Sequence, residues 1–280
     1  MGKSGFGLTL LTIGLAACEF SPPYGGDRVG VIVIESEVTS GEFRAAPSAT
    51  FWRSTLYQPD AIAVDTCFMM NLGNPQYGPV GSDRWNEVGE AGVNTSVIDG
   101  GQYIVIASPT ASDTMTFGYH ASGIGYRLNG SPFLNASPGD SVVIAVSGHS
   151  AGFPPALIRA QLGEPYQLDT VPTSPGEVAL TIEWDAAPEA GARMIVVLPF
   201  SSIVPPHPNP GINSAIYCSF PDTGVAIVPS NVMAYWRATY AEHREVYSSR
   251  VRFARVDLGP KTRLHVVSTH RGSSGNIVPD

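Results

Sequence analysis

The sequence predicts an all-β protein made of antiparallel, Ig-like β-sandwich domains, with at most one or two short helices. Charged residues make up only 14 % of the 280 residues, whereas 30 glycines and 24 prolines can end short strands in turns. The apolar content of 43 % is enough to fill a core and argues against disorder. Short apolar, β-branched segments recur along the chain between turn residues, which is typical of a sandwich or a barrel.

In the first half of the chain, strand-like segments follow one another from Val29 to Ser147. Turn-forming residues at 99–101, 129–130 and 137–140 separate several of them. We expect these segments at 29–35, 50–57, 61–70, 95–98, 103–107, 114–119, 124–128 and 141–147.

The second half begins after a proline-rich polar segment at 163–176, which is typical of a linker. We expect further strands at 177–184, 192–200, 212–219, 224–228, 245–258 and 262–269. Ser230 and Asn231 are good caps for one short helix over about 232–240. The chain therefore divides into an N-terminal sandwich at 29–162, a linker at 163–176 and a C-terminal sandwich at 177–280.

The first 17 residues have the features of a secretory signal. Lys3 precedes an apolar stretch that is too short to cross a membrane and that ends in small residues. The sequence Leu15-Ala16-Ala17-Cys18 resembles the lipobox of bacterial lipoproteins. This resemblance implies that Cys18 receives diacylglycerol and begins the mature protein, with 18–28 as a flexible tether. The alternative is a plain signal peptide that ends near a cysteine.

A lipidated Cys18 implies a protein of the bacterial cell envelope, held to a membrane by its N-terminal lipid. Glu19 follows the cysteine, and in enterobacterial lipoproteins a residue other than aspartate at this position favours the outer membrane.

Two cysteines, Cys67 and Cys218, remain for the folded part. Export to an oxidising compartment would allow a disulfide between them. Because they lie far apart in the sequence and in different predicted domains, we expect two separately buried thiols and keep the disulfide as the alternative.

The segment Gly148-His149-Ser150-Ala151-Gly152 follows an apolar strand and resembles the nucleophile elbow of α/β-hydrolases. That resemblance implies a serine esterase with Ser150 as nucleophile, Asp222 as acid and a downstream histidine, best His265, as base. Two prolines at 154–155 would disturb the helix that an elbow needs, and the long helices of that fold are missing from the pattern. We therefore expect a turn in a β protein and keep the esterase as the alternative function.

The sequence predicts no cofactor and no metal site. The six histidines are scattered without a metal-ligand spacing, and the net charge of −8 disfavours nucleic acid. Among the aromatic residues, Trp85 and Tyr57 are the best candidates for an exposed sugar-binding platform. A carbohydrate-binding module is thus a second alternative.

Several strand and turn segments resemble uncharacterised bacterial envelope lipoproteins with tandem β-sandwiches. They lie at Pro138–Ile144, Gly152–Pro155, Leu180–Trp184, Ile216–Gly224 and Ile227–Ser230. This resemblance implies a fold and no chemistry. The sequence thus predicts a lipid-anchored envelope protein with a non-catalytic binding or structural role, whose partner is an envelope protein or a polysaccharide.

Overall fold

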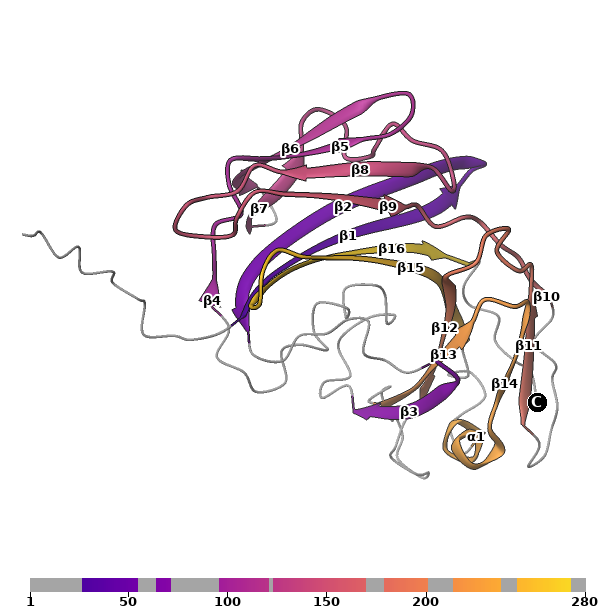
Figure 1. The fold of residues 1–280 in the computed structure, drawn as a ribbon. Helices are drawn as coiled ribbons and strands as arrows, with labels where there is room; N and C mark the ends of the chain where they lie inside the picture. The colour runs from indigo at the N-terminus through magenta and orange to yellow at the C-terminus, as the bar shows by residue number, and fades with distance from the viewer. Residues whose placement is uncertain are drawn as a thin grey trace, which may run out of the picture.

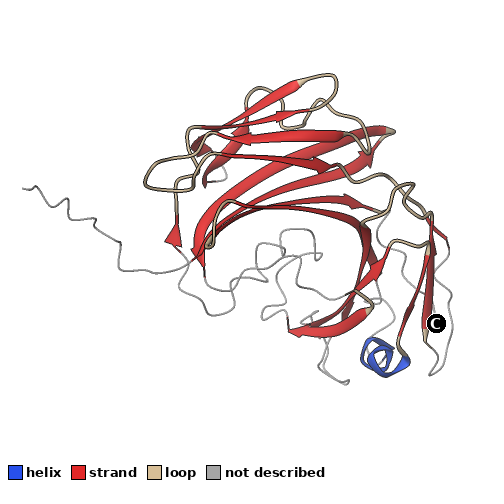
Figure 2. Ribbon diagram, in the orientation of Figure 1, coloured by secondary structure: helices blue, strands red, loops and turns tan. Residues whose placement is uncertain are grey.

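The computed structural model describes residues 27–54, 64–71, 96–120, 123–169, 179–200, 214–237 and 246–272. Within these ranges the chain forms sixteen strands in three sheets and one short helix (Figure 2). The predicted all-β, sandwich-like class is therefore confirmed. The same residues contain no helix that is both long and apolar enough to cross a bilayer.

The largest sheet, sheet A, has eight strands and a strong bend (Figure 1). Its order is β3 (Thr66–Asn71), β13 (Ser214–Pro221), β12 (Ala192–Phe200), β15 (Tyr247–Asp257), β16 (Thr262–Arg271), β1 (Asp27–Thr39), β2 (Glu42–Ser54) and β4 (Ser96–Val97). All neighbouring pairs are antiparallel except β1 and β16, which run parallel.

Two smaller sheets cover the outer, convex face of sheet A (Figure 1). Sheet B comprises β7 (Gly123–Leu128), β6 (Ser112–His120), β5 (Tyr103–Ala107), β8 (Ser141–Val146) and β9 (Ala156–Gln161). Sheet C comprises β10 (Leu168–Asp169), β11 (Leu180–Trp184) and β14 (Val225–Val228), and the helix α1 (Ser230–Arg237) follows it.

The long hairpin of β1 and β2 shows how local sequence sets this architecture. In β1 the side chains of Ile32 and Ile34 pack toward sheet B, while Val31 and Val33 face the other side of sheet A. Ser40 and Gly41, between the strands, both have positive φ angles, of 54° and 81°. Positive φ at both central residues is what a two-residue hairpin turn that matches the strand twist requires.

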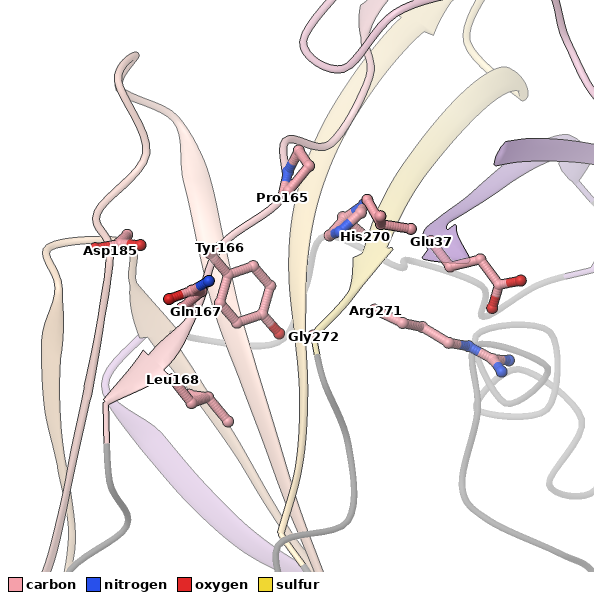
Figure 3. A pocket seen from close by; sticks show the side chains of 10 residues that line it. Glu37, Pro165, Tyr166, Gln167, Leu168, Asp185, His270, Arg271 and Gly272 are labelled. Carbon is pink, nitrogen blue, oxygen red and sulfur yellow. The ribbon is translucent and has the colours of Figure 1, made fainter. Parts of the chain in front are cut away.

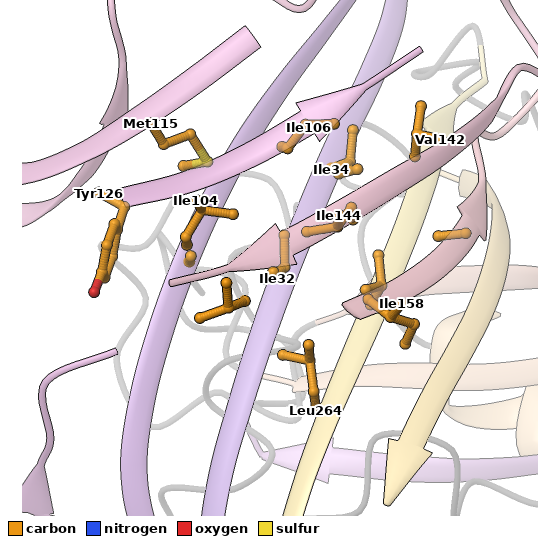
Figure 4. Packing of buried hydrophobic residues seen from close by; sticks show 14 of the residues in the cluster. Ile32, Ile34, Ile104, Ile106, Met115, Tyr126, Val142, Ile144, Ile158 and Leu264 are labelled. Carbon is orange, nitrogen blue, oxygen red and sulfur yellow. The ribbon is translucent and has the colours of Figure 1, made fainter. Parts of the chain in front are cut away.

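The convex face of sheet A carries two separate hydrophobic cores. The first lies between sheet B and the strands β1, β2 and β16, and isoleucines from both layers interdigitate in it (Figure 4). The second lies between sheet C, α1 and the strands β12 and β13, with Met194 and Trp236 near its centre. Because both cores are built on one sheet, sheet A is the layer that joins the whole described structure.

Sheet A also crosses the predicted domain boundary. It takes β1 to β4 from the residues before 163 and β12, β13, β15 and β16 from those after 176. Part of the expected linker is packed into the fold, since Gly163 donates its N–H to Ser268 Oγ at 2.9 Å and Glu164 is buried. Residues 163–169 are therefore a structural segment, while 170–176 lie outside the described residues.

The expectation of two separate thiols is wrong, because Cys67 and Cys218 form a disulfide. The two residues sit opposite each other in the register of β3 and β13, with Cα atoms 4.1 Å apart. The sequence separation of 151 residues hid this adjacency, which antiparallel pairing of β3 with β13 creates.

Candidate functional site

A pocket of about 790 Å³ lies between the ends of β1 and β16 in sheet A and the segment that leads into sheet C (Figure 3). The strands β1 and β16 run parallel, so both of their C-terminal ends reach this point. The segment before β10 and the residue after β11 form the opposite wall. The pocket is lined by Glu37, Val38, Pro165, Tyr166, Gln167, Leu168, Asp185, His270, Arg271 and Gly272.

The wall that carries Tyr166 is held by a buried arginine on β15. Arg250 is 1 % exposed and forms an ion pair with Asp222, with Nε and Oδ2 2.5 Å apart. Its Nη1 donates to the carbonyl oxygens of Glu164 and Pro165 at 3.2 and 3.1 Å, and its Nη2 donates to the carbonyl oxygen of Asp185. One guanidinium thus fixes both segments that form the wall, using the several donors that only arginine offers.

A second buried pair lies two residues further along the same face of β15. Arg252 Nη2 and Nε donate to the two carboxylate oxygens of Glu164 at 2.6 and 3.0 Å. Arg252 also donates to the carbonyl oxygens of Glu189 and Ala190 at 3.2 and 3.3 Å. Because a bidentate pair fixes orientation as well as distance, Glu164 holds residues 163–167 against the sheet.

His270 lines the pocket from β16 and is 2 % exposed. Ser36 Oγ lies 3.0 Å from the carbonyl oxygen of Thr269 and 3.0 Å from His270 Nδ1. When the hydroxyl donates to the carbonyl, its oxygen accepts from the N–H at His270 Nδ1. This network assigns the proton to Nδ1 and leaves the Nε2 lone pair as an acceptor. Burial, helped by the positive charge of Arg250, lowers the pKa of His270 to about 4, so the ring is neutral at physiological pH.

Tyr166 forms the floor between His270 and the buried arginine. Its hydroxyl donates to Ser248 Oγ at 2.7 Å, and its ring lies 5.0 Å below the guanidinium of Arg250. Burial raises the pKa of the Tyr166 phenol well above its ordinary value, so the hydroxyl stays protonated and acts as a donor. The edge of this ring faces His270, with the ring centroids 6.2 Å apart.

The exposed charges of the lining are mainly acidic. Glu37 accepts a hydrogen bond from Thr39 Oγ1 at 2.9 Å. Asp185 contacts Arg250 and Gln167 through its backbone carbonyl and N–H groups. Arg271 forms an ion pair with Glu35, 3.5 Å away. Figure 3 shows Asp185 and Glu37 toward opposite ends of the lining, with Tyr166 and His270 between them.

The three residues of the expected esterase triad are not brought together. Ser150 lies on an exposed turn after β8, and the chain continues into β9 instead of a helix. The Asp222 carboxylate is taken by Arg250 and by the indole N–H of Trp184 at 2.6 Å. His265 is buried within β16, on the concave side of sheet A that faces away from Asp222. The elbow resemblance therefore reflects a turn, whose Asp99–His149 ion pair is half exposed and spans 4.0 Å.

The remaining predicted site residues, Cys18, Tyr57 and Trp85, lie outside the described residues. Within the described part of the chain, no three histidine, cysteine or acidic side chains converge as a metal site would need. Comparison with models of known families, with curated proteins and with solved structures gives no match.

Sequence reasoning missed the pocket because its residues come from four separate segments. The alternation of Arg250 and Arg252 with Val251 and Phe253 predicts a half-buried strand with the arginines in solvent. The structure instead buries both faces of β15, and the acidic partners of the two arginines, Asp222 and Glu164, come from distant segments.

Proposed function

We propose that this chain is a lipid-anchored protein of the bacterial cell envelope that binds a small ligand, without chemical conversion, in the pocket at the end of β1 and β16. The observation that carries the binding role is how the pocket is built. A cavity of about 790 Å³ is within the usual size range of small-molecule sites. Its wall is fixed by two buried arginines, so it is formed before any ligand arrives.

The fold also gives this pocket an orientation relative to the proposed anchor. Lipid on Cys18 would tether the chain just before β1, which begins at Asp27. Glu37 lies ten residues further along the strand, or about 33 Å at 3.3 Å per residue. The pocket would therefore open at the end of the molecule that points away from the membrane, toward ligands in the surrounding compartment.

The lipid anchor is tested in cells that express the full chain and its Cys18→Ser variant. With an alkyne-labelled fatty acid in the medium, we expect label on the parent protein and none on the variant. We also expect the parent to enter the detergent phase on phase separation. An unlabelled parent protein that stays in the aqueous phase would remove the anchor from the proposal.

Ligand binding is tested with a variant that fills the pocket. Val38 is 48 % exposed in the lining, and Val225 is 49 % exposed on the outer face of sheet C, so Val38→Trp and Val225→Trp form a matched pair. The exported protein is purified from cells in detergent and examined by native mass spectrometry. We expect a bound small molecule on the parent and on Val225→Trp, and none on Val38→Trp. Equal occupancy of the two variants would contradict a ligand site here.

The carbohydrate-binding alternative stays a prediction, because Tyr57 and Trp85 lie outside the described residues. The pocket itself offers hydrogen-bonding groups without an exposed aromatic face among its described residues, since Tyr166 is buried against Arg250. A small polar ligand is the better match to this lining.

A further inference from the structure

The chemistry of the pocket lining narrows the class of ligand. We propose that the site binds a primary aliphatic ammonium group, which donates to His270 Nε2 and is attracted by the carboxylate of Glu37 at the same end of the lining. This inference rests on the proposed binding role and adds the identity of the recognised group. Three independent features of the described residues support it.

The first feature is a hydrogen-bond acceptor on a residue that lines the pocket. The proton of His270 lies on Nδ1, where Ser36 accepts it, so Nε2 presents a lone pair. Among the contacts of the described residues, Nε2 has no hydrogen-bond partner, although the residue is 2 % exposed and lines the pocket. A ligand N–H that enters the pocket can therefore donate to this lone pair.

The second feature is the balance of charge. The strongest cations near the pocket are already neutralised, because Arg250 pairs with Asp222 and Arg252 pairs with Glu164. Arg271 is likewise paired with Glu35. Glu37 and Asp185 are exposed lining residues whose carboxylates face no described cation within 4.0 Å. The lining thus favours a cation and opposes a carboxylate or phosphate.

The third feature is a set of apolar contacts beside the polar groups. Val38, Pro165 and Leu168 all line the pocket, and Val38 is 48 % exposed. These side chains can cover the carbon chain of an amine while its ammonium group reaches the acceptors. The combination distinguishes an aliphatic ammonium from a bare metal cation, for which the described residues offer no cluster of three ligands.

The test uses hexylamine, hexanol and hexanoate, which share one carbon chain and differ in the head group. Each is titrated into the isotope-labelled exported protein, and the backbone amide shifts of Gln167 and Gly272 report on the pocket. We expect saturable shifts with hexylamine, much weaker ones with hexanol and none with hexanoate. Saturation by hexanoate, or equal affinity for hexanol, would overturn the inference.

Variants locate the effect at the named acceptors. Glu37→Gln alters an exposed side chain and should weaken hexylamine binding by about tenfold, the worth of one charge-assisted hydrogen bond. Asp185→Asn, toward the other end of the lining, should weaken binding less, because that carboxylate attracts the ammonium group only at longer range. His270→Phe keeps a ring beside Phe43 and Tyr166 but removes the acceptor, and should weaken binding similarly. Asp65→Asn is the control, since Asp65 is an exposed carboxylate outside the pocket with a φ of 59° that asparagine tolerates.

The outcomes separate the inference from the proposed function. Unchanged hexylamine affinity in Glu37→Gln, or a loss of equal size in Asp65→Asn, would overturn the ammonium assignment. If hexylamine does not bind but Val38→Trp still removes a co-purified molecule, the ligand belongs to another class and the binding role stands. If neither experiment detects a ligand, both proposals fail.

Discussion

The guanidinium of Arg250 and the carboxylate of Asp222 form an ion pair in which both side chains are almost completely buried, 1 % and 2 % exposed. Arg250 belongs to β15 at the centre of sheet A, and Asp222 follows β13. The pair lies on the convex face of sheet A, where its partners come from the segment after β9 and from the end of β11 in sheet C. Arg250 donates hydrogen bonds to the backbone of both segments, at Glu164 and Pro165 on one side and at Asp185 on the other.

Loss of one partner of this pair should destabilise the fold strongly. Arg250→Met leaves the Asp222 carboxylate buried without its counter-charge, which typically costs about 3–5 kcal/mol. Asp222→Asn should cost less, because the amide oxygen can still accept from Trp184 Nε1. Denaturant unfolding of the single variants and of the double variant measures the coupling. We expect the double variant to be more stable than Arg250→Met alone, and strictly additive losses would show that the pair contributes no net interaction.

Reduction of the Cys67–Cys218 disulfide should lower stability without changing the fold. The bond closes a loop of 151 residues, and long loops lose the most chain entropy on cross-linking, so we expect a loss of roughly 2–5 kcal/mol. Cys67→Ala with Cys218→Ala should match the reduced parent in guanidinium unfolding. A parent whose unfolding midpoint does not respond to reductant would contradict this prediction.

The sequence predicted strands well where the pattern was local and poorly where pairing was distant. The expected segments at 103–107 and 192–200 have the bounds of β5 and β12, because both are uninterrupted apolar runs. β9 was missed, since its exposed positions carry Leu157 and Arg159 and two prolines precede it. The parallel pairing of β1 with β16 joins the two ends of the described chain, and no local pattern encodes it.

The candidate site could not be predicted for the same reason, because distant segments form it. Its acceptor, His270, and the tyrosine beside it, Tyr166, lie over a hundred residues apart and meet only because β16 ends beneath the segment that precedes β10. The segment Gly148–Gly152, which resembles a catalytic motif, is local in the sequence, and in the structure it forms the turn between β8 and β9.

The turn around Ser150 should depend on its glycines and not on its serine. Gly148 has a φ of 73°, and a Cβ there would lie 2.2 Å from the backbone nitrogen of Pro155. A Cβ on Gly152 would lie 2.0 Å from the carbonyl oxygen of Asp99. We expect Gly148→Ala and Gly152→Ala each to cost about 2 kcal/mol or more, and Ser150→Ala less than about 0.5 kcal/mol.

Thermal unfolding ranks these three variants, and a fluorophosphonate probe tests the serine directly. The probe should leave the parent protein unlabelled. Labelling of the parent that disappears in Ser150→Ala would restore the esterase alternative despite the separation of Ser150 from Asp222 and His265.

The neutral state of His270 should make stability fall in mild acid. Its pKa is about 4 in the folded protein and about 6.5 in the unfolded chain, so the unfolded state takes up the proton first as the pH falls. Neutral His270 thus contributes at most about 3 kcal/mol to the free energy of unfolding. This contribution is complete above about pH 6.5 and is lost between about pH 6.5 and about pH 4.

The test measures the free energy of unfolding at about pH 7.5 and about pH 4.5 for the parent and for His270→Phe. His149→Gln, on the exposed turn, is the control. The acid-induced loss should shrink by about 2 kcal/mol in His270→Phe, because burial beside Arg250 holds His270 neutral, and should stay at the parental value in His149→Gln on the exposed turn. An acid-induced loss in His270→Phe as large as in the parent would mean that other groups control the response to acid.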